Sequence, residues 1–192
     1  MKIIFATNNH HKLTEVQEIL GSDYQLVTPR DLGITEDIPE EQSTLEGNAF
    51  QKARYLYDRT GLDCFADDTG LEVDALGGAP GVHSARYAGE GRSSSDNVAL
   101  LLENLSGQTG RKARFRTVIA LILGGKEYQF DGVVDGMITD TPHGGGGFGY
   151  DPVFVPEGYD VTFAEMDSEV KNAISHRGRA VEKLAAFLSG AK

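Results

Sequence analysis

The sequence contains a single cysteine, Cys64, so no disulfide can form within the chain. Cys64 lies in an apolar run, and a chain without disulfides suits a reducing compartment. No stretch approaches the roughly 18 to 20 apolar residues that a membrane-spanning helix requires. The first residues, Met1 to Ala6, lack the long apolar core and the cleavage site of a signal peptide and read as a strand. We therefore expect a soluble, cytoplasmic protein that does not bind membranes.

Positive charge is also scarce in this sequence. The chain has 18 lysines and arginines against 29 aspartates and glutamates, which gives a formal net charge of −11. Non-specific binding to nucleic acid depends on basic side chains that replace the phosphate counterions, so we expect no nucleic-acid partner. The Gly-x-x-x-x-Gly-Lys-Ser/Thr pattern of a P-loop is missing as well. A small anionic ligand would then need a local basic pocket or a divalent cation.

The 192 residues suit one domain, since they contain no internal repeat, linker-like segment or low-complexity tract. Apolar periodicity predicts an α/β fold with a mixed sheet, because strand–helix units are followed by a long antiparallel pair that turns at Gly124-Gly125. The expected strands cover residues 1–6, 64–68, 71–73, 113–123, 126–130, 132–138 and 153–155. The expected helices contain residues 13–20, 45–57, 98–105 and 181–188, with a further helical start at residue 168.

The stretch from Cys64 to Tyr87 is the first place where the sequence points to chemistry. Apolar residues lead into Asp67 and Asp68, and Thr69-Gly70 then predicts a turn before the chain resumes extended structure. Two adjacent carboxylates at a strand end are suited to metal binding or acid–base catalysis. The same side chains also commonly satisfy nearby backbone N–H groups, so the pair alone does not establish a catalytic role.

Polar residues lie at the starts of the first two expected helices. Thr7-Asn8-Asn9-His10-His11-Lys12 follows the first strand, and a loop that opens a helix presents free N–H groups to an anion. These side chains could equally do no more than cap the helix. Glu40 and Glu41 precede a capping-box pattern at 43–46, and a solvated acidic loop is their simplest interpretation. Lys52, considered alone, is predicted to be an ordinary surface lysine.

A glycine-rich loop and a basic cluster complete the set of candidates. Four glycines, residues 144–147, precede Phe148, and such a run permits close approach of a backbone or a ligand. Phe148 could stack on an aromatic base and Asp151 could accept from ring N–H groups, although a flexible loop with a core phenylalanine is the simpler interpretation of this stretch alone. A cluster of cations and donors, Lys171, His176 and Arg177, falls near one helix start, where such clusters are usually solvated.

Taken together, six ordered motifs resemble those of the inosine triphosphate pyrophosphatases, over residues 3 to about 188. The motifs are Thr7-x-Asn9-x-x-Lys12, Ala66-Asp67-Asp68-Thr69-Gly70-Leu71, Leu76-Gly77-Gly78-Ala79-Pro80-Gly81, Ser84-Ala85-Arg86-Tyr87, Gly147-Phe148-Gly149-Tyr150-Asp151-Pro152 and Lys171-Asn172-x-Ile174-Ser175-His176-Arg177. The resemblance implies hydrolysis of ITP, dITP and XTP to the monophosphate and pyrophosphate. It also implies an elongated mixed β-sheet flanked by helices, two lobes around a central active-site cleft, and a homodimer.

The resemblance assigns roles to individual residues of this chain. It implies that Asp68 is the general base and, with Glu40, a ligand of Mg²⁺. The sequence departs from the family pattern before the second helix, so Glu40 is chosen over Glu41 only by counting back from Asn48. The implied substrate-binding residues are Thr7, Asn8, Asn9, His10, His11, Lys12, Lys52, Thr69, Phe148, Gly149, Tyr150, Asp151, Lys171, His176 and Arg177. The roles of Arg86 and Tyr87, in the cleft or at a subunit contact, stay open.

Base selection and two alternative functions follow from the same residues. Hypoxanthine and xanthine carry an acceptor oxygen at C6 where adenine carries an amino donor, so a donor-lined pocket would reject adenine strongly. Guanine shares that oxygen, and its exclusion must depend on the 2-position. A nucleotide sensor that binds without turnover and a related pyrophosphatase that prefers dTTP or UTP are the alternatives. Binding without hydrolysis would identify the sensor, and a panel of nucleoside triphosphates would identify the pyrimidine enzyme.

Overall fold

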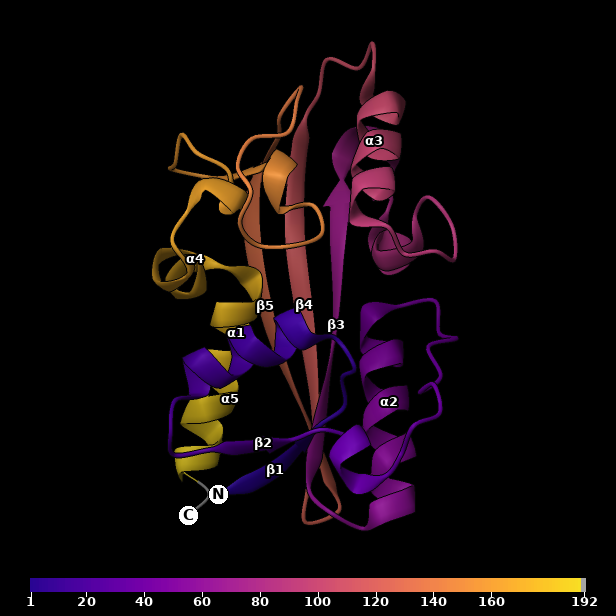
Figure 1. Cartoon of the computed structure of the whole chain (residues 1–192), viewed down its shortest axis with the longest axis vertical. Coiled ribbons are helices and arrows are strands. Elements are labelled where there is room, and N and C mark those ends of the chain that lie inside the picture. Colours follow the sequence, from indigo (N-terminus) through magenta and orange to yellow (C-terminus); the bar gives the residue numbers. More distant parts are fainter. Residues whose placement is uncertain (191–192) are drawn as a thin grey trace. The chain divides into compact units, whose positions relative to one another are not determined.

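A computed structural model of the chain describes residues 1–190 and contains one six-stranded sheet flanked by helices (Figure 1). The strands are β1 (Lys2–Phe5), β2 (Gln25–Val27), β3 (Cys64–Val73), β4 (Lys112–Leu123), β5 (Lys126–Ile138) and β6 (Phe154–Pro156). The α-helices are α1 (His10–Leu20), α2 (Leu45–Thr60), α3 (Ser94–Leu105), α4 (Ser168–Ile174) and α5 (His176–Gly190). The expected mixed α/β class is confirmed.

The strand order in the sheet is β2-β1-β3-β4-β5-β6. Strand β1 runs parallel to both β2 and β3, with Ile4 opposite Cys64, whereas β5 and β6 are antiparallel, with Met137 opposite Val155. The neighbouring strands β4 and β5 are joined by Gly124 and Gly125, whose φ angles of 57° and 76° are the two positive values that a type I′ hairpin turn requires. The predicted hairpin turn is therefore confirmed.

Two local predictions were wrong. No turn follows Asp68, because β3 continues through Thr69-Gly70 to Val73. Leu71 and Val73 are fully buried, so continuing the strand keeps apolar side chains in the core, and this outweighs the turn preference of Thr-Gly. The capping box at 43–46 does not form either. Thr44 caps α2 by accepting from the N–H of Gly47, which has no side chain to return the bond.

The chain divides into two compact units that are not continuous in sequence: residues 1–68, 117–132 and 177–192 form unit 1, and residues 69–116 and 133–176 form unit 2. The boundaries at 68/69 and 176/177 separate Asp68 from Thr69 and His176 from Arg177. The predicted site residues therefore fall into two groups, one in each unit. The expectation of a single domain stays a prediction.

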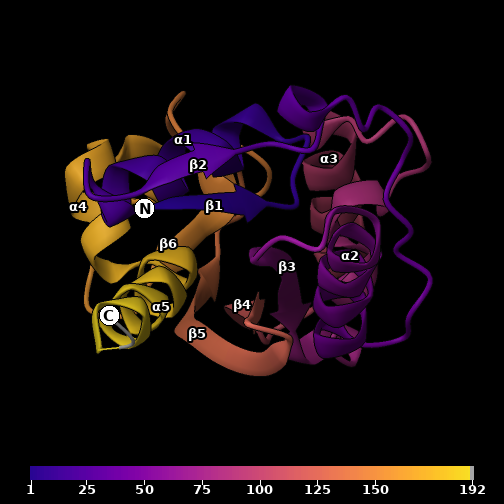
Figure 2. The ribbon, with the colours of Figure 1, turned by 90° about the horizontal axis from the view of Figure 1, so that it is seen from below.

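In unit 1, helices cover both sides of the strands. Figures 1 and 2 show α5 on one side of β3 and β4 and α2 on the other. On the α5 side, Phe5 and Phe65 stack with ring centroids 4.6 Å apart within an apolar core. On the other side, Ala49, Ala53 and Leu56 of α2 are fully buried. This packing fixes β3 between two helical layers as it reaches Asp67 and Asp68.

In unit 2, an aromatic and aliphatic core lies beneath α3. It contains Leu71 and Val73 of β3, Val98, Leu101 and Leu105 of α3, Phe115 of β4, and Tyr150, Phe154 and Phe163. The three phenylalanines lie within 4.5 to 6.1 Å of one another between ring centroids. Among the residues described, no helix is both long enough and apolar enough to cross a membrane.

Candidate active site

Strand β3 places Asp67 and Asp68 in different surroundings. Successive side chains of a strand point to opposite faces, so an uninterrupted β3 sends the two carboxylates to opposite sides of the sheet. Asp67 faces cations from α1 and α5, whereas Asp68 lies near Glu40 and Lys52 of the α2 side. The two adjacent acids are therefore suited to different tasks.

Asp67 is the centre of an ion-pair cluster in unit 1. Its two carboxylate oxygens each lie 3.2 Å from Nζ of Lys12, and Nε of Arg177 lies 3.5 Å from Oδ2. Nη1 of Arg177 also donates to Glu15 on α1. Burial raises the pKa of Asp67, but the positive charges of Lys12, Arg177 and Lys52 outweigh it and hold the pKa well below its usual range. Asp67 is thus a permanently charged anchor for these basic side chains.

Asp68 has the opposite shift. Burial raises its pKa, the charges of Glu40 and Asp67 act in the same direction, and Lys52 and Lys12 only partly oppose them. Its side chain is nearly buried, with 9% exposure for the whole residue. A pair of acids whose surroundings push their pKa values apart is the arrangement that separates a general base from a charge-stabilising partner. Asp68 is the member of the pair with raised proton affinity.

Lys52 links the acids of unit 1 and is not the surface lysine that its sequence context suggested. It is 5% exposed, and its Nζ lies 2.6 Å from Oε1 of Glu40 and donates to the backbone oxygen of Asp67 at 2.6 Å. Burial lowers the pKa of Lys52, but Asp68, Glu40 and Asp67 outweigh it and raise the pKa above its ordinary value. The lysine therefore stays protonated between the acids.

Glu40 and Glu41 are distinguished by their partners. Glu40 binds Lys52 and its charge acts on Asp68, whereas Glu41 is exposed and pairs with Gln51 through its backbone N–H at 2.9 Å and its carboxylate at 3.4 Å. The neighbouring residue Gln42 donates its N–H to the buried amide of Asn48 at 2.8 Å. These contacts turn Glu40 toward the acids of β3 and Glu41 away from them.

The donor set of this region fits Mg²⁺. Glu40 and Asp68 offer hard carboxylate oxygens, and Mg²⁺ is usually held by one or two carboxylates together with water and substrate phosphates. Among residues 1–190, no group of three or more His, Cys, Asp or Glu side chains is placed to enclose a metal ion.

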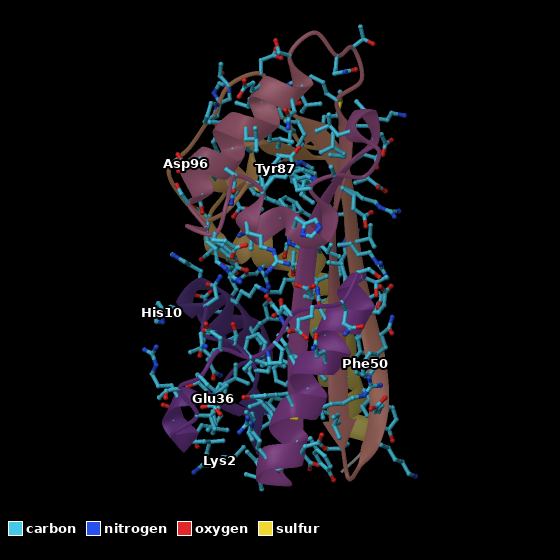
Figure 3. The ribbon with its side chains drawn as sticks, turned by 90° about the vertical axis from the view of Figure 1, so that its right-hand side faces the viewer. Lys2, His10, Glu36, Phe50, Tyr87 and Asp96 are labelled. Atoms are coloured by element: carbon cyan, nitrogen blue, oxygen red, sulfur yellow. The ribbon has the colours of Figure 1, made fainter. Side chains whose placement is uncertain are left out.

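The loop before α1 has an ordinary helix cap. Oδ1 of Asn9 accepts from the N–H groups of His11 at 3.0 Å and Lys12 at 3.2 Å, and the hydroxyl of Thr7 accepts from the N–H of Asn9 at 3.0 Å. Asn8, Asn9, His10 and His11 are exposed, and Figure 3 shows the side chain of His10 pointing away from the ribbon. Burial lowers the pKa of Lys12 below its ordinary value, although Asp67 acts in the opposite direction.

In unit 2, Asp151 organises the predicted base-binding residues. Its Oδ2 accepts from Nζ of Lys171 at 2.7 Å and from the N–H of Phe148 at 2.9 Å. Nζ of Lys171 lies 5.1 Å from the centroid of the Phe148 ring, within cation–π range. Gly147 is required here, because its φ is +64° and a Cβ would overlap the carboxylate of Asp151. The ring of Phe148 is therefore held in a defined position.

The glycine-rich loop is tied to its neighbours by close backbone contacts. The N–H of Gly146 donates to the carbonyl of Ala164 at 2.9 Å, and a Cβ at Gly144 would collide with the same backbone. The hydroxyl of Thr162 donates to the carbonyl of His143 at 2.7 Å. Close approach of two backbones, rather than flexibility, accounts for Gly144 and Gly146.

The C-terminal cluster is buried rather than solvated. Lys171, His176 and Arg177 are 4%, 3% and 2% exposed, so the surface interpretation of these residues was wrong. The His176 ring stacks on Phe115 at 4.5 Å in unit 2, while Arg177 joins Asp67 and Glu15 in unit 1. Charged groups are rarely buried unless they are paired, and both cations have a carboxylate partner, Asp151 for Lys171 and Glu15 for Arg177.

The remaining predicted residues have simpler surroundings. Thr69 is half-buried on β3 and follows Asp68 in the chain. Gly149 has a φ of +62° and open space around its Cα, whereas Tyr150 is 5% exposed and its hydroxyl donates to a backbone carbonyl at 2.6 Å. Tyr150 is therefore a structural side chain in this conformation. Tyr87, whose role the sequence left open, has a hydroxyl that accepts from Asn104 on α3.

Sequence reasoning did not assign Asp67, Glu15 or Asn48 to the site. Glu15 lies three residues after Lys12, so both occupy one face of α1 and can share a cluster of opposite charges. The alternation of a continuous strand would have separated Asp67 from Asp68. The turn predicted after Asp68 hides this alternation.

Comparison with known proteins identifies the family of the chain. A model described as the Ham1 family matches residues 3–187. Proteins named dITP/XTP pyrophosphatase from Flavobacterium johnsoniae and Porphyromonas gingivalis are 51% and 56% identical to it over 192 residues, covering 100% of this chain and 100% and 99% of theirs. The solved structure of the Staphylococcus aureus Ham1 protein superposes with a TM-score of 0.91 at 40% identity, and both chains are covered completely. The motif resemblance is confirmed, and this chain belongs to the Ham1 family.

Proposed function

We propose that this protein hydrolyses non-standard purine nucleoside triphosphates, ITP, dITP and XTP, to the nucleoside monophosphate and pyrophosphate. Such a reaction would keep these bases out of DNA and RNA. The observation that carries the proposal is full-length similarity, at about half of all positions, to relatives named dITP/XTP pyrophosphatase. The contrasting surroundings of Asp67 and Asp68 support it, because they supply a base and a separate charged anchor.

Asp68 would act as the general base. Its carboxylate would take a proton from a water molecule as that water attacks phosphorus, the α–β phosphoanhydride bond would break, and pyrophosphate would leave. When bound to Glu40 and Asp68, Mg²⁺ would neutralise charge on the triphosphate. Lys52 holds a positive charge between the two carboxylates, which limits their mutual repulsion. Its burial makes that charge more effective than it would be in water.

The phosphates would be held by the start of α1 and by the neighbouring cations. The exposed N-terminal loop presents uncharged donors at the positive end of the helix dipole, and Lys12 is fixed beside it by Asp67. Thr69 would add a hydroxyl from β3. Because Asp67 also holds Arg177, it would orient two cations toward one anionic ligand.

The base would be recognised by the residues that Asp151 organises. Phe148 offers an aromatic ring with a fixed position, and Lys171 supplies a buried donor suited to the C6 oxygen of hypoxanthine or xanthine. With adenine bound, the Lys171 donor would face the amino group of the base and would have no acceptor. Such a mismatch gives strong discrimination against adenine nucleotides. Gly149 and His176, of the same unit, complete the proposed base-binding set.

A substrate panel tests the proposal. Purified protein with Mg²⁺ is incubated with ITP, dITP, XTP, ATP, GTP and dTTP, and pyrophosphate and orthophosphate are measured separately. We expect pyrophosphate as the first product, released much faster from ITP, dITP and XTP than from the others, and no turnover after chelation of the metal. Orthophosphate as the first product, or equal rates on all purines, would contradict the proposal. Faster turnover of dTTP would instead identify a pyrimidine enzyme.

We further propose that the active protein is a cytoplasmic homodimer. The only cysteine, Cys64, is fully buried as a thiol that donates to the carbonyl of Ala53, and burial raises its pKa to about 12. Such a thiol is unreactive and the fold uses no disulfide, which supports a reducing compartment.

The proposed homodimer has a separate test. Sedimentation of the purified protein measures the number of subunits, and a monomer at assay concentrations would exclude the dimer.

A further inference from the structure

A buried hydrogen-bond network in unit 2 ends at the loop that contains Phe148 and Asp151. Its centre is Ser84, which is 6% exposed and lies in the 3-10 helix Gly81–Arg86. The carbonyl of Ser84 accepts from the Tyr150 hydroxyl at 2.6 Å, and the Ser84 hydroxyl donates to the carbonyl of Gly81 at 2.6 Å. We call the residues Ser84, Tyr150 and Asn97 the Ser84 network.

The Ser84 network also reaches β3 and α3. The hydroxyl of Ser84 accepts from the N–H of Leu71 at 2.9 Å, two residues beyond Thr69. Asn97, which is 4% exposed on α3, donates to the carbonyls of Ser84 at 3.4 Å and Ala85 at 3.1 Å and accepts from the N–H of Ala88 at 2.7 Å. Three segments far apart in sequence are therefore joined through one serine.

Tyr150 is the only residue of this network that belongs to the glycine-rich motif, and its neighbours are Gly149 and Asp151. Gly149 has a left-handed conformation with a φ of +62°, and an added Cβ would meet no atom within 4 Å, so no side chain at this position packs against the rest of the unit. The Tyr150 ring packs in the apolar core of unit 2 and its hydroxyl is satisfied by Ser84. Tyr150 is thus a further restraint on Phe148 and Asp151, in addition to the pair between Asp151 and Lys171.

We propose that Tyr150 is a positioning residue that sets purine affinity through the Ser84 network, rather than a residue that contacts the nucleotide. This inference rests on the proposed function, because it assigns the Phe148–Asp151 loop to the base. Loss of the hydroxyl removes one neutral buried hydrogen bond, a change of about two- to tenfold in an equilibrium constant. Purine binding requires the ordered loop, so the apparent affinity falls with the ordered fraction and by no more than this factor.

The test compares Tyr150→Phe with Tyr87→Phe. Tyr87 lies beside α3 in the same unit (Figure 3), and its hydroxyl accepts an exposed hydrogen bond from Asn104 at 2.7 Å. Binding of IMP and, separately, of pyrophosphate with Mg²⁺ is measured by calorimetry, together with kcat and KM for ITP. We expect Tyr150→Phe to weaken IMP binding and raise KM by at most about tenfold, with pyrophosphate binding and kcat unchanged. Tyr87→Phe should change neither ligand's affinity.

Hydrogen exchange gives a readout that does not depend on turnover. Peptides covering residues 148–151 should exchange faster in Tyr150→Phe than in wild type, while those of α5 should not change. Unchanged IMP binding in Tyr150→Phe, or equal weakening of IMP and pyrophosphate, would overturn this inference while a wild type active on ITP leaves the proposed function standing. A wild type that neither hydrolyses ITP nor binds IMP would overturn both.

Discussion

The buried ion pair between Lys171 and Asp151 makes a quantitative prediction about stability. Both side chains are 5% exposed and their charged atoms lie 2.7 Å apart. Replacing Lys171 with methionine keeps most of the side-chain volume but leaves a buried carboxylate without its cation. Removal of one partner of such a pair costs about 3 to 5 kcal/mol. For a chain of this size, each kcal/mol lowers the Tm by about 2 to 4 °C, so we expect Lys171→Met to lower it by about 6 to 20 °C.

Thermal unfolding followed by circular dichroism measures this change, with Arg54→Met as the matched control. Arg54 forms a two-point ion pair with Glu127 at 2.7 and 2.8 Å, but these side chains are 55% and 40% exposed. An exposed pair contributes less than about 1 kcal/mol, so this control should shift the Tm by less than about 4 °C.

A second substitution separates loss of charge pairing from loss of packing. In the Lys171→Met background, Asp151→Asn removes the unpaired charge while its amide oxygen can still accept from the N–H of Phe148. The double variant should therefore be more stable than Lys171→Met alone. Two results would contradict a buried, water-excluded pair between Lys171 and Asp151: a Tm for Lys171→Met within about 3 °C of wild type, or a double variant no more stable than the single one. Either result would mean that the pair contributes about 1 kcal/mol or less, as a solvent-exposed pair does.

Two further predictions concern activity. Lys52→Met removes a positive charge that lowers the pKa of Asp68, so this pKa should rise and the acidic limb of the kcat/KM profile should move to higher pH. An acidic limb at the wild-type pH would show that Lys52 does not act on the catalytic base. Gly147→Ala should displace the Asp151 carboxylate and weaken IMP binding in calorimetry. Gly149→Ala has open space for the added Cβ, so it should cost only about 1 to 2 kcal/mol of backbone strain and weaken IMP binding less. Equal loss of IMP affinity in the two variants would contradict the close contact at Gly147.

Most elements could be predicted because their signals are local. Period-3.6 apolar positions placed α1 and α2, and Gly61, with a φ of 65°, ends α2 as a left-handed glycine should. Strand β2 was missed, since Gln25–Val27 has three residues and too little alternation to recognise. The turn expected after Asp68 failed for a different reason. Burial of Leu71 and Val73 is a tertiary effect, and it outweighs the local preference of Thr69-Gly70.

The site was predicted in composition but not in its internal connections. Family motifs supplied Asp68, Lys171 and Arg177, yet residue by residue each basic side chain looked like solvated surface. Burial of Lys52 between Glu40 and the Asp67 backbone depends on the packing of α2 against β3, which no sequence window contains. Ion-pair partners far apart in the chain, such as Glu15 and Arg177, can be found only once the fold brings them together.

We propose that Asp68 is the catalytic base while its neighbour Asp67 anchors the surrounding cations. Pyrophosphate release from dITP by Asp68→Asn and Asp67→Asn, with the Tm of each, tests this claim most directly. We predict that Asp68→Asn loses nearly all turnover at a Tm close to wild type. Asp67→Asn should be the less stable of the two, because it removes the buried carboxylate charge that Lys12 and Arg177 share. Full turnover by Asp68→Asn would contradict the account.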